Sequence, residues 1–336
     1  MAATSRVWAD VDFERDGRQA GYLYLPHSVT RSGYGHVATP VAVIRNGDGP
    51  TALLMAGNHG DEYEGQVVLG RLARELDPAR IRGRVILVTQ SNAPAAQAGV
   101  RVSPIDGGNL NRAFPGDPDG TPTFAMAHYY DSVLFPMADA LIDVHSGGIS
   151  MDYLPFASLC LSGDAEVDER ARALLAAFDA PISIVWDAVD ARMAECAAAR
   201  RGVAAISGEF GGAGTVRQAG LAIVERGIEG ALAHLGMLRD GPRRSAASGR
   251  NATRWMEIPG NDFYAFANAA GVFEPLVALG DTVAAGQPCG RLHFVDEPLR
   301  EPVTVPFREA GLVVCLRQPA RVERGDCVGH LARDAA

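Results

Sequence analysis

Two short segments of this 336-residue sequence carry side chains that could bind a catalytic metal ion. Gly57-Asn-His59-Gly-Asp-Glu62 places a histidine and a carboxylate three residues apart, and Leu141-Ile-Asp-Val-His145 ends an apolar run with a second histidine. A His-x-x-Glu pair alone is weak evidence, because it arises by chance in many chains. Two imidazoles and one carboxylate, with the fourth position holding water, are the ligand set of catalytic zinc. We therefore predict a zinc site made by His59, Glu62 and His145.

Two further carboxylates could assist such a metal. Zinc lowers the pKa of its water to about 7 and polarises a carbonyl oxygen, and the water then needs a base. Glu209 ends an otherwise apolar run, where burial is costly without a purpose, so we predict that it is the base. Asp143 stands two residues before His145 and could orient that imidazole. The alternatives are a glutamate that caps the glycine-rich turn and an ordinary carboxylate at a strand end.

The segment 101–116 is rich in turn-forming residues and also carries two arginines and three asparagine or aspartate side chains. Such a loop suits the recognition of an anion. Arg112 can bind a substrate carboxylate through two parallel hydrogen bonds, with Asn111 beside it. Arg101 could stabilise the oxyanion of a tetrahedral intermediate, although a surface arginine is the simpler interpretation.

Apolar runs that alternate with helical patterns between residues 50 and 238 predict the elements that hold these side chains. Apolar runs indicate strands at 51–57, 85–89, 138–144 and 202–210, and amphipathic spacing indicates helices at 64–76, 167–178 and 216–238. This alternation predicts an α/β fold with a mixed, largely parallel sheet flanked by helices. Ligands of such sheets bind outside the carboxyl ends of the strands. His59, His145 and Glu209 all follow strand ends and should therefore meet in one cleft.

The composition changes after this α/β region. Residues 1–240 are expected to form the catalytic domain, 241–254 a linker rich in Arg, Ser, Gly and Asn, and 255–336 a smaller all-β domain. The last part contains a loose internal echo, 270–283 against 310–328, which predicts two similar β-hairpin units packed face to face. This pattern resembles the β-sandwich of biotinyl and lipoyl carrier domains. Those carriers modify a lysine, and the chain has none, so we expect a structural role.

Composition narrows the class of partner. A net charge of −9 argues against nucleic-acid and anionic-membrane partners, which need a basic face. No apolar run reaches the roughly 20 residues that span a bilayer, and the acidic start of the chain is unlike a signal peptide. The five cysteines lack paired spacing and indicate neither disulfides nor a cysteine-bound metal. We expect a cytoplasmic protein that acts on a small molecule, and a homo-oligomer is a weaker expectation.

Taken together, the candidate residues resemble those of the succinylglutamate desuccinylase/aspartoacylase family, relatives of the zinc carboxypeptidases. Six residues carry the resemblance in their order and roles: His59, Glu62, Asn111, Arg112, His145 and Glu209. The resemblance covers nearly the whole chain, including the small C-terminal β domain. It implies a zinc-carboxypeptidase-like fold, one zinc ion at His59, Glu62 and His145, Glu209 as general base, and a substrate carboxylate bound by Asn111 and Arg112.

The resemblance also implies a reaction, the removal of an acyl group, specifically acetyl, from an N-acyl amino acid. The segments 46–50, 57–65, 103–108 and 111–116 are most similar to family members that act in ectoine degradation, which makes N-alpha-acetyl-L-2,4-diaminobutyrate the first expected substrate. Gly107-Gly108 is an insertion relative to the tighter aspartoacylase loop. A substrate of this kind also presents a cation. Its candidate partners are Asp152, Asp187 and Asp190, although each could equally be a solvated surface acid.

Alternative functions remain open at this point. Another N-acyl amino acid, of the acetylaspartate or succinylglutamate type, would use the same metal and base. A zinc carboxypeptidase would also use them, but it needs a cleft that admits a peptide. A non-enzymatic binding module predicts that a ligand or the base is missing, whereas all four residues are present. Imidazole and carboxylate ligands would also accept cobalt, nickel or manganese.

Overall fold

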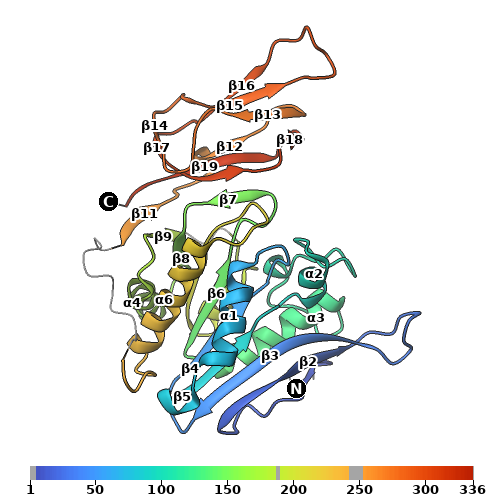
Figure 1. Ribbon diagram of the computed structural model, residues 1–336, viewed down its shortest axis with the longest axis vertical. Coiled ribbons are helices and arrows are strands. Elements are labelled where there is room, and N and C mark those ends of the chain that lie inside the picture. Colours follow the sequence, from blue (N-terminus) through green and yellow to red (C-terminus); the bar gives the residue numbers. More distant parts are fainter. Residues whose placement is uncertain (1–4, 187–189, 242–252, 336) are drawn as a thin grey trace.

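A computed structural model describes residues 5–186, 190–241 and 253–335 of the chain. Most of its strands join one large sheet, in the order β1-β2-β3-β5-β4-β6-β10-β8-β9-β11-β19-β17-β14 (Figure 1). The strands up to residue 209 are β1 Trp8–Ala9, β2 Gly17–Pro26, β3 His36–Asn46, β4 Thr51–Ala56, β5 Gly83–Val88, β6 Ala140–His145, β7 Met151–Tyr153, β8 Phe156–Cys160, β9 Ile182–Trp186 and β10 Ala204–Glu209.

Parallel pairing dominates the centre of this sheet. β4 runs parallel to both β5 and β6, and β10 runs parallel to β6, in the registers Ala52↔Ala140 and Glu209↔His145. β3 and β8 are antiparallel to their neighbours β5 and β10. The sheet is therefore mixed and largely parallel at its centre, which confirms the predicted α/β fold class.

Helices cover both faces of the sheet and enclose two apolar cores. One core packs α1, α4 and α6 against one face, and the other packs α3 and α5 against the opposite face. The helices are α1 Glu64–Glu75, α2 Ala93–Ala98, α3 Pro122–Tyr129, α4 Ala165–Phe178, α5 Ala194–Arg200 and α6 Gln218–His234. Short 3₁₀ turns lie at Pro78–Arg80, Leu110–Arg112, Phe135–Met137 and Asn261–Phe263, and a π-helical turn lies at Tyr130–Leu134.

The strands and helices predicted from apolar spacing are all present, with ends shifted by a few residues. The predicted strand 202–210 is β10, and the predicted helix 216–238 is α6. Sequence spacing did not predict the long antiparallel pair β2 and β3, which extends the sheet at the edge near the N-terminus. β2 alternates buried and exposed residues, because one of its faces contacts the core and the other contacts solvent.

The C-terminal part is all β, as predicted. Its strands are β11 Arg254–Glu257, β12 Tyr264–Phe266, β13 Gly271–Pro275, β14 Thr282–Val283, β15 Pro288–His293, β16 Val303–Pro306, β17 Gly311–Arg317, β18 Arg321–Val322 and β19 Cys327–Asp334. β13, β15, β16 and β18 form a separate four-stranded sheet. This sheet and the strands around β17 and β19 share one apolar core, which is the arrangement of a small sandwich.

Two strands connect the C-terminal part to the α/β part. β11 runs parallel to β9 and antiparallel to β19, and β7 pairs with β17. The predicted linker, 241–254, falls mostly on residues 242–252, which lie outside the described residues. The domain boundaries stay a prediction, because hydrogen-bonded strands continue from one part into the other.

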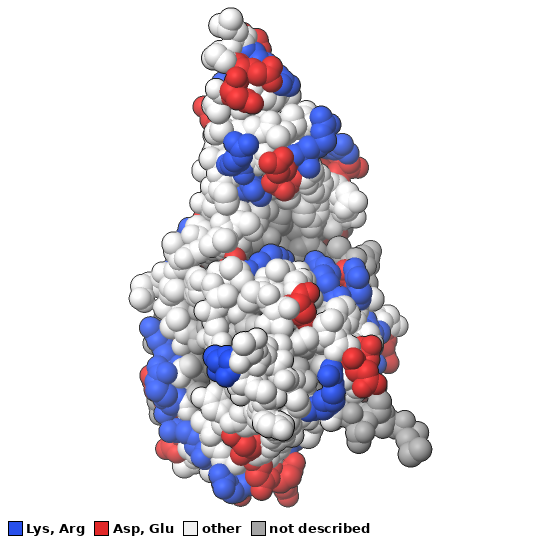
Figure 2. Space-filling model, turned by 90° about the vertical axis from the view of Figure 1, so that its right-hand side faces the viewer, with Lys and Arg blue, Asp and Glu red and all other residues white. Residues whose placement is uncertain are grey.

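The face in Figure 2 intersperses acidic and basic side chains, and its described residues form no continuous basic patch. In the described part of the chain, no helix is long and apolar enough to cross a membrane.

Candidate metal and catalytic site

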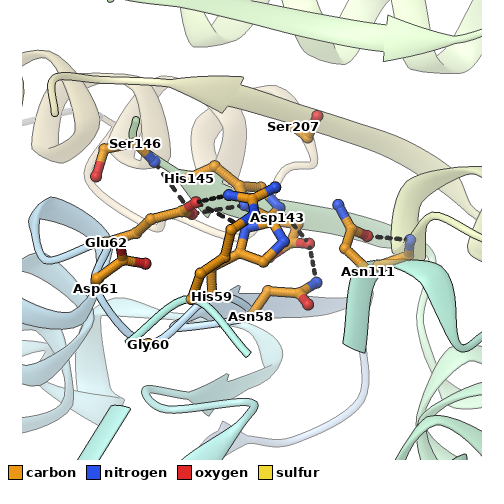
Figure 3. Close-up of polar contacts among 12 residues, drawn as sticks. Asn58, His59, Gly60, Asp61, Glu62, Asn111, Asp143, His145, Ser146 and Ser207 are labelled. Atoms are coloured by element: carbon orange, nitrogen blue, oxygen red, sulfur yellow. Dashed lines mark hydrogen bonds and ion pairs between the residues drawn. The ribbon is translucent and has the colours of Figure 1, made fainter. Parts of the chain in front are cut away.

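The turn between β4 and α1 places His59 and Glu62 together. Its shape depends on close packing, because a Cβ atom on Gly60 would lie 2.0 Å from the carbonyl carbon of Ala95 in α2. β6 supplies His145, and Asp143 is two residues earlier, so both side chains lie on the same face of that strand. In Figure 3 the side chains of His59, Glu62, Asp143 and His145 point toward one another.

The three predicted metal ligands form one buried cluster. Nδ1 of His59 lies 2.7 Å from Oε1 of Glu62, and Nδ1 of His145 lies 2.8 Å from Oε2 of the same carboxylate. One candidate ligand atom from each residue lies within 4.8 Å of the others. Burial opposes ionisation of Glu62, but the two adjacent imidazoles outweigh it and hold the pKa of Glu62 below its usual range. Two imidazoles and an ionised carboxylate at this spacing could hold a divalent metal ion.

Both histidines are oriented by an oxygen acceptor on the far side of the ring. Nε2 of His145 lies 2.9 Å from Oδ2 of Asp143, and Nε2 of His59 lies 3.2 Å from Oδ1 of Asn109. Asp143 is in turn held by Asn58, whose Nδ2 donates to Oδ2 at 2.9 Å. Such contacts fix which ring nitrogen faces a metal ion. In both rings the nitrogen that faces the cluster is Nδ1.

Glu209 lies at the end of β10, where it pairs in register with His145. Its Oε2 atom is buried and has no hydrogen-bond partner among the described residues. Burial, with the nearby charge of Glu62, raises the pKa of Glu209 to about 8. A carboxyl group with a pKa near neutrality can both accept and release a proton at physiological pH.

A cavity of about 200 Å³ opens over this cluster, and it contains six of the predicted residues in its wall: His59, Arg101, Asn111, Arg112, His145 and Glu209. Glu62 and Asp143 are 2% and 0% exposed and lie close against these residues. A second cavity, of about 210 Å³, lies between α1 and α6. None of the predicted site residues lines it, so the chemistry locates the site in the first cavity.

The side chains of the loop that are predicted to bind an anion, Arg101, Asn111 and Arg112, all line the cavity. Oδ1 of Asn111 accepts from the backbone N–H of Ala194 at 2.8 Å, and Asn111 is 5% exposed. Nη1 of Arg112 donates to the Asn111 carbonyl at 2.7 Å, and its Nε lies 3.2 Å from Oδ2 of Asp190. Nη1 of Arg101 lies 3.4 Å from Oε1 of Glu62. All three side chains therefore have polar groups close to the His59, Glu62 and His145 cluster or its cavity.

Sequence patterns did not identify several residues of the cavity wall. Tyr153, Trp186, Glu195 and Tyr264 line it together with the predicted residues. Tyr264 comes from β12 of the C-terminal part, and no local pattern in the sequence indicates that it reaches the site. Glu195 could have been identified from the sequence, because it is the single charged residue in the apolar run Met193-Ala-Glu-Cys-Ala-Ala-Ala199.

Two of the suggested partners for a substrate cation, Asp152 and Asp190, do not line the cavity. Oδ2 of Asp152 lies 2.6 Å from Nη2 of Arg217, and Asp190 contacts Arg112 and Arg192 at 3.2 and 2.9 Å. Asp187 lies outside the described residues. In the described structure these two aspartates therefore already pair with arginines.

Comparison with known proteins identifies the family of this chain. The sequence model of the succinylglutamate desuccinylase/aspartoacylase catalytic domain matches residues 48–235. The chain is 42% identical over 335 residues to the N-alpha-acetyl-L-2,4-diaminobutyric acid deacetylase of Halomonas elongata, covering 98% of this chain and 95% of that protein.

Two solved structures have closely similar folds. A succinylglutamate desuccinylase/aspartoacylase from Rhodobacter sphaeroides superposes with a TM-score of 0.92 at 40% identity, covering 98% of this chain and 100% of that chain. The product-bound ectoine utilization protein EutE (DoeB) from Ruegeria pomeroyi gives 0.93 at 38% identity, covering 98% and 99%. The chain therefore belongs to the succinylglutamate desuccinylase/aspartoacylase family, as the resemblance predicted, and is a hydrolase of the N-acyl amino acid deacylase class.

Proposed function

We propose that this chain is a zinc-dependent deacetylase that removes the acetyl group from N-alpha-acetyl-L-2,4-diaminobutyrate. The observation that carries the proposal is the buried cluster of His59, Glu62 and His145 in one cavity with Glu209. The substrate is suggested by the Halomonas elongata relative, which is named for this reaction. The cavity, of about 200 Å³, suits a small acyl amino acid better than a peptide chain.

The donor set fits the proposed metal. His59 and His145 would bind zinc through Nδ1, since Nε2 of each ring already contacts an oxygen acceptor. Glu62 would supply the third ligand. Bound zinc would lower the pKa of a water molecule and polarise the amide carbonyl of the substrate. Asp143 would keep the His145 ring in place and raise its basicity as a ligand.

Glu209 is proposed as the base and then the acid. It takes a proton from the attacking water as the new C–O bond forms, and it returns that proton to the amide nitrogen as the C–N bond breaks. The products are acetate and the free amine, and no other reactant is needed. A pKa raised to about 8 by burial favours this role, because both the ionised form that accepts the proton and the protonated form that returns it are then populated near neutral pH.

Three cationic or amide side chains are proposed to position the substrate. Arg112 and Nδ2 of Asn111 would bind its carboxylate, since Oδ1 of Asn111 already accepts a hydrogen bond from the backbone of Ala194. Arg101 lines the same cavity beside Glu209 and would stabilise the negative charge that develops on the carbonyl oxygen.

Initial-rate measurements on the zinc-loaded protein test the proposal. N-alpha-acetyl-2,4-diaminobutyrate is compared with acetylaspartate and succinylglutamate, and a chelator-treated sample is the control. We expect selective turnover of the first compound and its loss on chelation. Preference for either of the other two would overturn the proposed substrate, and full activity without metal would overturn the mechanism.

Three further expectations from the sequence stay predictions: a cytoplasmic location, a homo-oligomeric state, and a purely structural role for the C-terminal sandwich.

A further inference from the structure

One buried acid in the cavity wall has no part in the mechanism proposed above. Glu195, the second residue of α5, is 1% exposed and lines the same cavity as Asn111, Arg112 and Glu209. Its Oε1 accepts a hydrogen bond from Oγ of Ser207 at 3.1 Å. Its Oε2 is buried with no hydrogen-bond partner among the described residues.

An unpaired carboxylate oxygen at this depth needs an explanation. Leaving a buried acceptor unsatisfied costs about 1–3 kcal/mol, and more when the group is charged. Burial raises the pKa of Glu195 above its usual range, because the ionised carboxylate is poorly solvated there. A cationic donor that enters the cavity would supply the missing partner.

The position of Glu195 matches the layout of the proposed substrate. The backbone N–H of Ala194, its neighbour in sequence, donates to Oδ1 of Asn111. Asn111, which is proposed to bind the substrate carboxylate, is therefore held against the start of α5, the helix that carries Glu195. A substrate with an α-carboxylate and a side-chain ammonium presents opposite charges only a few bonds apart, as this wall does.

The other acidic residues considered for this role already have a different function or an arginine partner. Within the described part of the chain, the carboxylates that line this cavity are Glu195 and Glu209, and Glu209 is needed for proton transfer. Asp152 and Asp190 lie outside the cavity wall and pair with arginines.

We propose that Glu195 binds the side-chain ammonium group of the substrate and selects N-acylated amino acids that carry a cationic side chain. This inference rests on the proposed deacylase function. A primary ammonium group has three N–H donors, one of which would pair with the free Oε2 while Ser207 keeps Oε1. A hydrogen bond between two charged groups is about twice as strong as a neutral one, so it discriminates well against a neutral side chain.

The test compares two substrates that differ only in the amine. N-alpha-acetyl-2,4-diaminobutyrate carries it, and N-alpha-acetyl-2-aminobutyrate does not. Glu195→Gln keeps the size of the side chain and an oxygen for Ser207 but removes the charge. We expect kcat/KM for the cationic substrate to fall about 10- to 100-fold, mainly through KM, as a lost charged hydrogen bond predicts. The kcat/KM for the neutral substrate should change little. The ratio of kcat/KM for the cationic substrate to that for the neutral substrate should therefore fall by about the same factor.

Two other variants sharpen the test. Glu195→Asp keeps the charge on a shorter side chain and should retain part of the ratio, and it replaces Glu195→Gln if that variant does not fold. Asp152→Asn is the matched control, because it neutralises a buried acid outside the cavity, and it should leave the ratio unchanged. An unchanged ratio in Glu195→Gln, or a collapsed ratio in Asp152→Asn, would overturn the inference while leaving the proposed function intact.

Failure of the proposed function has a different signature, namely a wild-type protein that does not turn over the acetylated diaminobutyrate. In that case the role of Glu195 is tested separately, by calorimetric measurement of the binding of free 2,4-diaminobutyrate and 2-aminobutyrate. Tighter binding of the diamine by the wild type, lost in Glu195→Gln, supports the role of Glu195. Equal binding of both compounds by the wild type refutes it.

Discussion

Acid should destabilise this protein through His330, a histidine buried between the two parts of the chain. His330 lies on β19 and is 3% exposed, and its ring is 5.5 Å from that of Tyr153 and 4.8 Å from that of Tyr264, measured between centroids. Its Nδ1 has no hydrogen-bond partner among the described residues. Burial away from water lowers the pKa of His330 from 6.5 to about 4, because the charged form is poorly solvated there.

The sign and size of the effect follow from these two values. Above pH 6.5 the imidazole is neutral in both the folded and the unfolded chain, and stability does not depend on it. Between pH 6.5 and about 4 only the unfolded chain binds the proton, so the free energy of unfolding falls as the pH falls. The difference between the two pKa values, at 1.36 kcal/mol per unit, amounts to about 3 kcal/mol, most of which is lost by pH 4 and the rest below it.

Urea unfolding of metal-free wild type and His330→Gln at several pH values from 7.5 to 4 measures this loss. Removing the metal from both proteins excludes zinc release as a cause. We expect the wild type to lose about 3 kcal/mol more than the variant over this range, whatever their difference at pH 7.5. His36→Gln, at an exposed histidine, is the control. Parallel pH dependences of wild type and His330→Gln would refute the reasoning, since His330 would then be able to take up its proton in the folded state.

Three predictions concern the metal and the base. Glu209→Gln should retain the metal but lose about 10²- to 10⁴-fold in kcat; near-wild-type turnover with metal bound would show that another group transfers the proton. His145→Ala should lose the metal, as measured by elemental analysis after dialysis, whereas the exposed His36→Ala should keep it; unchanged metal content in His145→Ala would mean that the ligand set is wrong. Asp143→Asn should weaken metal affinity about 10- to 100-fold, measured by competition with a chelator, and an unchanged affinity would assign Asp143 a purely structural role.

Local spacing in the sequence was enough to predict most of the contacts within the candidate metal-binding cluster. His59 and Glu62 lie on a single turn after β4, so their approach needs no distant contact. Asp143 and His145 share a face because side chains alternate along a strand, and their contact at 2.9 Å follows from that period. The fold class could be predicted for a similar reason, because apolar runs and helical spacing reflect burial against a sheet.

Only the tertiary structure brings the remaining residues to this cluster. Glu209 reaches His145 because β10 pairs with β6, and no short-range pattern specifies which strands become neighbours. Asn109 reaches His59 from a loop fifty residues away, and Tyr264 enters the cavity from the C-terminal sandwich. Glu195 stands out in the sequence as a lone charged residue in an apolar run. Its direction into the cavity depends on how α5 packs against β6, β8 and β10, and such packing is set by long-range contacts between side chains that are far apart in the chain.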